Sequence, residues 1–388
     1  MPEPVKLPLS ERAQRLPPSG IRKFFDLIQS MDNVISLGVG EPDFPTPWRI
    51  REAAIYALER GLTHYTSNYG LPELRDGIAQ YLGERYGVSY STGDEILVTV
   101  GVSEGLDLAM RAVLDPGDEV IVPEPAYVSY VPCVILAGGV PVPVKTVAEN
   151  GFRVSAAEIE AKITAKTKVL MLNFPNNPTG AVMDRAGLTE VAEVASRHNL
   201  LVIADEVYDR LVYDHVHTCF ASLPGMRERT ILLGGFSKDF AMTGWRVGYA
   251  AAPRAVLEAM MKVHQYTMLC APTPSQFAAL AALTLEDEEV EAMVTEYDHR
   301  RRLVVKGLND IGLACFEPRG AFYAFPSIAA TGLSSDEFTE RLLKQEQVAV
   351  VPGSAFGDAG EGYVRCCYAV STIEIDEALN RMARFVKG

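Results

Sequence analysis

Apolar and polar positions follow two different periods along this chain. Short, nearly continuous apolar runs predict buried strands, whereas apolar residues recurring every three to four positions predict amphipathic helices. Between residues 95 and 252 strands and helices alternate, with helices such as Ser103–Leu114 and Leu188–His198. This alternation predicts an α/β fold with a mostly parallel sheet covered by helices. Its seven expected strands are Ile96–Val100, Glu119–Val122, Val140–Val144, Val169–Leu172, Leu201–Ala204, Ile231–Leu233 and Val247–Ala252.

The flanking segments predict a second, smaller domain. Before the sheet we expect a strand at Val34–Leu37 and helices at Ser19–Gln29, Pro47–Leu58 and Pro72–Tyr86. After the sheet, a long helical pattern over Asp287–Asn309 leads into an α+β lobe. The lobe is expected to contain strands at Ala314–Phe316, Ala321–Phe325, Val348–Val351 and Tyr363–Tyr368, and helices at Ser335–Glu346 and Thr372–Lys387. We therefore expect a large domain over residues 46–286 and a small domain made of residues 1–45 and 287–388.

Composition narrows the class of protein. The 388 residues are 48% hydrophobic and 22% charged, which is typical of a globular protein with an ample core. A net charge of −14 disfavours nucleic acids and anionic membranes as partners. The sequence contains no run of about 18 apolar residues, so no membrane span is expected. The six cysteines include no Cys-x-x-Cys pair, and the N-terminus lacks an apolar signal region, so we expect reduced thiols, no metal site and a cytoplasmic location.

The segment Gly234–Tyr249 joins two predicted strands and carries distinctive chemistry. Lys238 and Arg246 lie on this connection, where side chains from a rigid scaffold can converge. Burial favours the neutral amine, so a buried Lys238 can act as a nucleophile toward a carbonyl. An isolated lysine is usually a solvated surface residue, but apolar neighbours such as Phe240 and Trp245 argue against that here. No glycine directly precedes Lys238, which excludes a P-loop.

Other polar motifs also follow strands, at the edge of a parallel sheet where ligands bind. Gly101–Gly105 opens a helix whose free N–H groups favour a phosphate, although a plain helix cap is the simpler interpretation. Asp205 ends an apolar strand, where a carboxylate needs a partner. Metal binding by Asp205 and Glu206 is the alternative, but adjacent histidines are lacking. Arg365, in an apolar strand, is either an edge residue or a clamp for a carboxylate.

Several complete phrases resemble one enzyme family. Ser237–Gly248, which reads Ser-Lys-x-Phe-Ala-Met-Thr-Gly-Trp-Arg-x-Gly, resembles the cofactor-lysine motif of class I aminotransferases of fold type I. These enzymes use pyridoxal 5′-phosphate (PLP). Leu37–Phe44, Gly70–Arg75 and the phrase Asn-x-Pro-x-Asn-Pro-Thr-Gly at Asn173–Gly180 resemble the same family, so the likeness extends over nearly the whole chain.

The resemblance implies a role for each candidate residue. The catalytic residues are Lys238, which carries the cofactor and moves protons, Asp205, which pairs with the pyridine nitrogen, and Tyr208. The residues that complete the cofactor site are Val102 and Ser103 with Arg246 at the phosphate, Tyr127 stacked on the ring, Asn177 with Tyr208 at the ring oxygen, and Tyr65 reaching the partner's phosphate in a homodimer. Arg365 holds the substrate α-carboxylate beside the Gly40 backbone, with Asn177 nearby.

One position departs from the family pattern. Many relatives carry a serine three residues before the lysine as a further phosphate ligand, and Gly235 stands there in this chain. Ser237 or the backbone must take over that contact.

The resemblance implies transamination between an amino acid and a 2-oxo acid such as 2-oxoglutarate, in ping-pong fashion through pyridoxamine phosphate. A PLP-dependent C–S or β-lyase shares most of these residues and is one alternative. A PLP-binding regulator is another, but it needs a DNA-binding domain, and the chain has neither spare length nor a basic patch for one.

We expect an enzyme that prefers aromatic amino acids as amino donors or has broad donor specificity. Several bacterial aspartate aminotransferases carry a distal-carboxylate lysine where Ser103 stands, so a strict aspartate enzyme is the less favoured alternative. Ser19–Phe24 and Val263–Tyr266 also resemble aromatic and broad-specificity relatives. Arg22 is expected at the pocket mouth, swinging in for acidic substrates, with an ordinary exposed helix residue as the alternative.

Overall fold

All seven apolar segments join one sheet, which confirms the predicted α/β fold. The computed structural model describes residues 9–16, 31, 33–285 and 287–387. The strand order is β2-β8-β7-β6-β5-β3-β4, and only β8 runs antiparallel to its neighbours. The strands are β2 (Ile96–Thr99), β3 (Glu119–Glu124), β4 (Val140–Lys145), β5 (Thr167–Asn173), β6 (Leu201–Asp205), β7 (Thr230–Gly235) and β8 (Gly248–Ala251).

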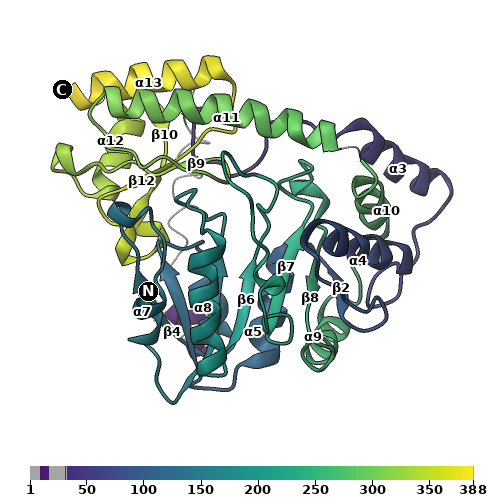
Figure 1. The fold of residues 1–388 in the computed structure, drawn as a ribbon. Coiled ribbons are helices and arrows are strands. Elements are labelled where there is room, and N and C mark those ends of the chain that lie inside the picture. Colours follow the sequence, from purple (N-terminus) through teal and green to yellow (C-terminus); the bar gives the residue numbers. More distant parts are fainter. Residues whose placement is uncertain (1–8, 17–30, 32, 286, 388) are drawn as a thin grey trace, which may run out of the picture.

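Successive strand residues point to opposite faces of the sheet, and each face packs on its own helices. In β6, Val202 and Ala204 belong to one buried cluster and Ile203 to the other. Figure 1 shows α8 in front of the sheet and α5 behind it. The helices of this domain are α3 (Trp48–Glu59), α4 (Pro72–Tyr86), α5 (Gly101–Val113), α6 (Tyr130–Leu136), α7 (Ala156–Glu160), α8 (Arg185–Arg197), α9 (Arg254–Thr267) and α10 (Thr273–Ala282).

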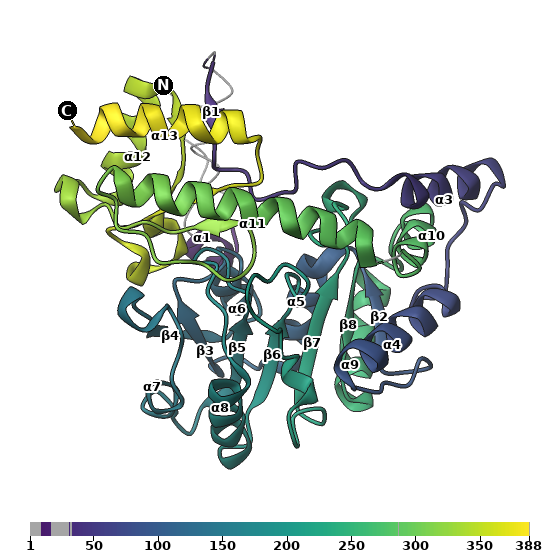
Figure 2. The same ribbon diagram turned by 45° about the horizontal axis from the view of Figure 1, so that its top comes forward.

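The C-terminal part forms a separate α+β lobe above the sheet. The helix α11 (Asp287–Asp310) runs from the side of α3 and α10 to this lobe (Figures 1 and 2). Its other elements are β9 (Tyr323–Ala324), α12 (Ser335–Glu346), β10 (Val348–Ala349), β11 (Val351–Pro352), β12 (Val364–Cys367) and α13 (Thr372–Lys387). Strands β11, β12 and β9 form an antiparallel sheet.

The N-terminal segment contacts both parts. Strand β1 (Ile35–Ser36) pairs in parallel with β10, so this early segment extends the C-terminal lobe. The short helix α1 (Glu11–Arg15) instead lies against α6, where Arg12 Nη1 donates to the Leu136 carbonyl at 3.1 Å. The expected helix Ser19–Gln29 lies outside the described residues. Among those described, no helix has the length and apolarity to span a membrane.

Two predictions for the lobe need correction. Ala314–Phe316 is not a strand, because only the single bridge between Cys315 and Pro326 forms. Pro326 has no N–H to extend a ladder. The expected strand Val348–Val351 is divided into β10, which pairs with β1, and β11, which pairs with β12.

Candidate active site

A cavity of about 280 Å³ lies where the loops after the sheet strands meet the C-terminal lobe. Every predicted site residue lines it except Tyr65 and Arg22. Tyr65 is 82% exposed on the loop before α4, and Arg22 lies outside the described residues. The lining is Gly38, Gly40, Val102, Ser103, Leu106, Tyr127, Tyr130, Asn173, Asn177, Asp205, Val207, Tyr208, Ser237, Lys238, Thr243, Arg246, Tyr323 and Arg365.

Lys238 extends into this cavity from the loop after β7. Its Nζ donates to the Gly40 carbonyl at 2.7 Å. Burial lowers the pKa of the amine to about 8, and the nearby Arg365 guanidinium lowers it further against the opposing effect of Cys367. A substantial fraction of Lys238 is therefore neutral slightly above pH 7, as a nucleophile or general base requires.

Asp205 ends β6 at the floor of the cavity. Burial raises the pKa of its carboxyl to about 6, while a hydrogen bond from Tyr130 lowers it. The Tyr130 hydroxyl donates to Oδ2 at 2.8 Å, and the Val207 amide donates to Oδ1 at 3.3 Å. No lysine or arginine forms an ion pair with Asp205 among the described residues. A buried carboxylate with this environment fits a cationic ligand group, such as a protonated ring nitrogen.

Glu206 does not share this site. One of its carboxylate oxygens lies 2.8 Å from His217 Nε2, and the other accepts from the Phe220 amide at 2.8 Å. Glu206 therefore forms a separate buried pair and is not part of the cavity lining.

The start of α5 and Arg246 form what we call the phosphate cup, defined as Gly101, Val102, Ser103 and Arg246. Gly101 has φ +72°, and a Cβ there would lie 2.7 Å from Arg246 Nη2, so the guanidinium lies directly over the helix start. The first N–H groups of a helix lack intrahelical partners and favour an anion. Arg246 is held by its own donation to the Thr243 carbonyl at 3.0 Å.

The glycine that replaces the family serine has a steric cause here. A Cβ at Gly235 would lie 2.8 Å from Val102 Cγ2, so a serine would displace the residue whose amide belongs to the phosphate cup. Ser237 lines the cavity and is the hydroxyl that this loop supplies instead.

Arg365 lies on β12 of the C-terminal lobe, lines the cavity and is 3% exposed. Its Nη1 donates to Asn177 Oδ1 at 2.9 Å and its Nη2 to the Gly38 carbonyl at 2.7 Å. The guanidinium carbon lies 4.5 Å from the Tyr323 ring centroid, and Nε is buried without a hydrogen-bond partner. The planar cation is thus held in place and retains donor capacity for a carboxylate ligand.

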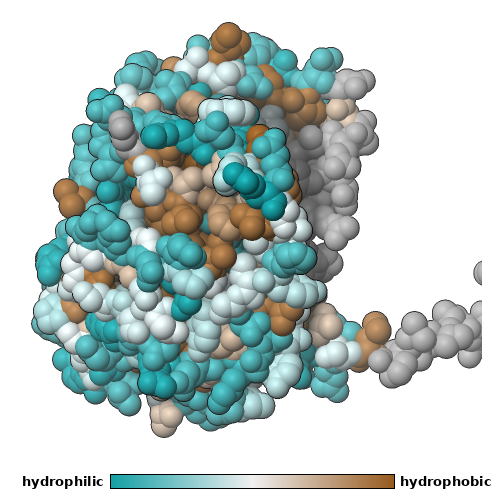
Figure 3. Space-filling model, turned by 90° about the vertical axis from the view of Figure 1, so that its right-hand side faces the viewer, coloured by the Kyte–Doolittle hydropathy of each residue, from teal (hydrophilic) through white to brown (hydrophobic). Residues whose placement is uncertain are grey.

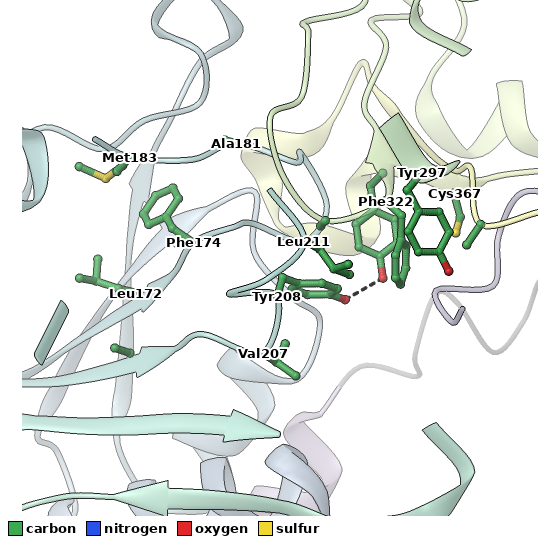
Figure 4. Packing of buried hydrophobic residues seen from close by; sticks show 14 of the residues in the cluster. Leu172, Phe174, Ala181, Met183, Val207, Tyr208, Leu211, Tyr297, Phe322 and Cys367 are labelled. Atoms are coloured by element: carbon green, nitrogen blue, oxygen red, sulfur yellow. Dashed lines mark hydrogen bonds between the residues drawn. The ribbon is translucent and has the colours of Figure 1, made fainter. Parts of the chain in front are cut away.

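Tyr208 reaches from the loop after β6 to the aromatic cluster of the lobe, near Phe322 (Figure 4). Its hydroxyl lies 2.8 Å from the Tyr323 hydroxyl. Burial raises the pKa of Tyr208 well above its usual value, so the hydroxyl stays protonated and can donate. A Cβ at Gly40 would lie 2.5 Å from the Tyr323 hydroxyl, which accounts for glycine at that position.

Sequence reasoning missed Tyr130, Tyr323, Asn173 and Thr243, all of which line the cavity. Tyr130 could have been found, because it lies three residues after Tyr127 and their rings pack edge to face at 5.5 Å. Tyr323 and Thr243 carry no comparable sequence signal, since their position depends on how the lobe meets the sheet.

Together these groups suit one kind of cofactor. The cavity lining combines a buried carboxylate, an anion-binding helix start and an amine of lowered pKa. A flat, cationic ring that carries a phosphate and a carbonyl matches this set, and Arg365 leaves a place for a substrate carboxylate.

Comparisons with known proteins agree with this geometry. The sequence model of the family described as aminotransferase class I and II matches residues 32–382. The chain is 50% identical to an aspartate aminotransferase of Pyrococcus abyssi and 49% identical to aromatic-amino-acid aminotransferase 2 of Thermococcus litoralis, each match covering 98% of both chains. It resembles the crystal structure of an aromatic aminotransferase from Pyrococcus horikoshii with a TM-score of 0.90 and 49% identity, over 94% of this chain and 98% of that one.

Proposed function

The chain belongs to the class I and II aminotransferases, and we propose that it uses PLP to transfer amino groups from bulky, chiefly aromatic, amino acids to 2-oxoglutarate. The observation that carries the PLP assignment is the position of Lys238. Its amine, with a pKa lowered to about 8, lies in the same cavity as the buried Asp205 and the phosphate cup.

When bound, PLP supplies an electron sink beside the Cα of the amino acid. Lys238 would hold the cofactor and would move a proton between Cα and the C4′ atom, as general base and acid. Asp205, oriented by Tyr130, holds the proton on the pyridine nitrogen. Tyr208 and Asn177 would donate to the ring oxygen of the cofactor, and Tyr127 would pack against its ring.

The remaining residues bind and orient. Arg246 and the amides of Val102 and Ser103 would bind the phosphate, because its negative charge is favoured by the guanidinium and by the free N–H groups of the helix start. Arg365 binds the α-carboxylate bidentately beside the Gly40 backbone, fixing the Cα–H bond relative to Lys238.

The preference for bulky donors rests on the cations available. The described residues that line the cavity include three cations, Lys238, Arg246 and Arg365, and each already has a role. A second substrate carboxylate buried without a cation costs several kcal/mol. Ser103 supplies no charge, and aromatic walls such as Tyr127 favour a ring. Arg22 is proposed to swing in for 2-oxoglutarate and out for aromatic donors.

A donor panel tests the substrate assignment. kcat/KM is compared for phenylalanine, tyrosine, 2-aminoadipate, alanine and aspartate with 2-oxoglutarate, in wild type and Arg22→Ala. Phenylalanine and tyrosine are expected to lead in the wild type, and the variant to lose acidic substrates selectively. Aspartate preferred over every aromatic donor by more than about a hundredfold contradicts the bulky-donor assignment. Unchanged acidic and aromatic rates in the variant contradict the role of Arg22.

We also propose a homodimer with domains over residues 46–286 and over 1–45 with 287–388. The pairing of β1 with β10 supports this division into domains.

The surface supports the homodimer. The face on which α3 lies carries hydrophobic side chains (Figure 3), and Tyr65 projects from the loop that follows α3. In the proposed dimer Tyr65 would contact the partner's cofactor phosphate.

We also propose a cytoplasmic location. It is supported by the six free cysteine thiols, which suit a reducing compartment.

A further inference from the structure

A buried glutamate–histidine pair adjoins the phosphate cup without lining the cavity. Glu104 lies on α5, one residue after Ser103, and His264 lies on α9. His264 Nδ1 is 2.6 Å from Glu104 Oε1, and the two side chains are 0% and 6% exposed. A carboxylate can only accept, so Nδ1 carries the proton and donates to it.

The second oxygen of Glu104 holds the backbone at the entrance to the helix. Glu104 Oε2 accepts from the Val100 amide at 2.5 Å, and Val100 directly precedes the first residue of α5. The Thr99 hydroxyl donates to the Gly101 carbonyl at 2.9 Å and fixes the same turn. The N–H groups of Val102 and Ser103 lie in the first turn of α5, where they lack intrahelical partners, and both residues line the cavity.

The backbone of the phosphate cup packs closely against β8, on the side away from the Glu104 side chain. A Cβ at Gly248 would lie 2.8 Å from the Val102 nitrogen and 2.9 Å from the Gly101 carbonyl carbon. The helix start is therefore held between β8 and the Glu104 side chain, and the direction of its amides depends on both.

From these contacts we infer that Glu104 and His264 are positioning residues for the phosphate cup, acting through the Val100 amide to aim the Val102 and Ser103 amides at the cofactor phosphate. This inference rests on the proposed PLP function. Packing alone does not explain the histidine, because its Nε2 is buried without a partner and a phenyl ring would fill similar space without that cost.

The chain offers a matched control in a second buried pair. Glu206 likewise accepts from a backbone amide, that of Phe220, with one oxygen and contacts His217 with the other, each at 2.8 Å. Among the described residues, the hydrogen bonds and ion pairs of this pair do not include the cup residues, so His217→Phe removes a comparable histidine–glutamate contact away from the cup.

The test measures how much the phosphate contributes to cofactor affinity. Apoprotein is titrated with PLP and with pyridoxal, which lacks the phosphate, and the Kd for pyridoxal divided by the Kd for PLP is compared among variants. His264→Phe is expected to weaken PLP binding about tenfold and leave pyridoxal binding unchanged, so the ratio falls about tenfold. His264→Asn, whose amide can still donate to Glu104, is expected to keep the wild-type ratio, and so is His217→Phe.

The outcomes distinguish a failure of the proposed PLP function from a failure of the positioning role of Glu104 and His264. A wild-type apoprotein that binds PLP no better than pyridoxal contradicts the proposed function itself. A wild-type preference that survives intact in His264→Phe, or an equal loss of PLP and pyridoxal affinity there, overturns the positioning role. If His264→Phe does not fold, Glu104→Asp replaces it. Its shorter side chain cannot maintain both contacts, so the ratio is expected to fall, and an unchanged ratio overturns the inference.

Discussion

At the residue scale, burial shifts two reactive groups in complementary directions. It lowers the pKa of Lys238 to about 8 and raises that of Asp205 to about 6. The shift of Lys238 brings proton exchange on its amine close to neutral pH, where a group that must both take and return a proton works best. Tyr130 tunes the second group, since its hydrogen bond opposes the effect of burial on Asp205.

Removing the charge of Asp205 is predicted to impair catalysis more than binding. Asp205→Asn should bind PLP but lose about a hundredfold or more in kcat, because the lost charge acts on the transition state rather than on docking. Steady-state kinetics and PLP titration check this together. An unimpaired kcat in this variant contradicts the role given to Asp205.

Tyr130→Phe is predicted to lower kcat about three- to thirtyfold with little change in PLP affinity. The variant removes the donor to Asp205 Oδ2, which leaves the carboxylate less stabilised and its pKa higher. Tyr90→Phe is the control, since that hydroxyl is buried without a hydrogen-bond partner. Equal effects of the two substitutions would mean that the Tyr130 hydroxyl has no specific function.

Arg365→Lys is predicted to lower kcat/KM for amino acids by about a hundredfold. A lysine keeps the charge but cannot reproduce the planar fork held by Asn177 and Gly38. PLP affinity of the apoprotein should stay within about twofold of wild type. A large loss of PLP affinity would show that Arg365 shapes the cofactor site rather than the substrate site.

At the element scale, the loops after β6 and β7 are joined directly behind the cavity. Asp209 follows Tyr208, Asp239 follows Lys238, and the two buried carboxyl groups share a hydrogen bond. The hydroxyls of Tyr81 and Tyr86 on α4 donate to Asp209 Oδ2 at 2.7 and 2.5 Å. Tyr208 and Lys238 are thus held relative to one another by their sequence neighbours.

This pair predicts a pH dependence of stability. Burial and the neighbouring Asp209 raise the pKa of Asp239 well above its usual value, so Asp239 stabilises the fold at acidic pH and that contribution is lost as pH rises toward its folded pKa. Asp239→Asn keeps a donor to Asp209 and cannot ionise. The Tm of the variant apoprotein relative to wild type should therefore increase from pH 5 to pH 9, and a constant difference contradicts a protonated Asp239.

The elements show which parts of the structure a sequence can predict. The seven sheet strands were predictable because most of them are nearly continuous apolar runs, and α4 begins and ends where Pro72 and Gly87 indicate. The helices α6 and α7 were missed because five to seven residues are too few for a helical period, although Ser155 and Glu158 form a capping box at α7. The division of Val348–Val351 depends on partners from distant segments, which a local pattern does not contain.

The same contrast holds for the candidate site. Residues that directly follow sheet strands, such as Asp205 and Lys238, could be placed because strand ends meet at one edge. Tyr323 could not, because it comes from the lobe and reaches Tyr208 only through the packing of the two parts.

At the scale of the whole molecule, the exposed face near Tyr65 predicts association. The loop of Tyr65 is joined to the end of α9 by the Asn68 side chain, which donates to the Leu269 carbonyl at 2.7 Å. Tyr65, Met268 and Leu269 are 82%, 52% and 37% exposed, so this surface is apolar as well as ordered. Burying such side chains against a second copy is favourable.

Sedimentation analysis is predicted to show a particle of two chains. Tyr65→Asp combined with Met268→Asp should shift it toward one chain, since each change places a charge in the proposed interface. Ile373→Asp, an exposed apolar residue at the start of α13, serves as the control and should leave the mass unchanged. A wild-type particle of one chain contradicts the dimer.

The most direct test of the central claim is to locate the cofactor chemically. The purified protein is expected to be yellow, and borohydride reduction followed by peptide mapping should place the reduced cofactor on Lys238. Incubation with phenylalanine and no 2-oxo acid before reduction should abolish this adduct, because the cofactor then leaves the lysine as pyridoxamine phosphate. An adduct on another lysine, or one on Lys238 that persists after incubation with every donor in the panel, would contradict the account.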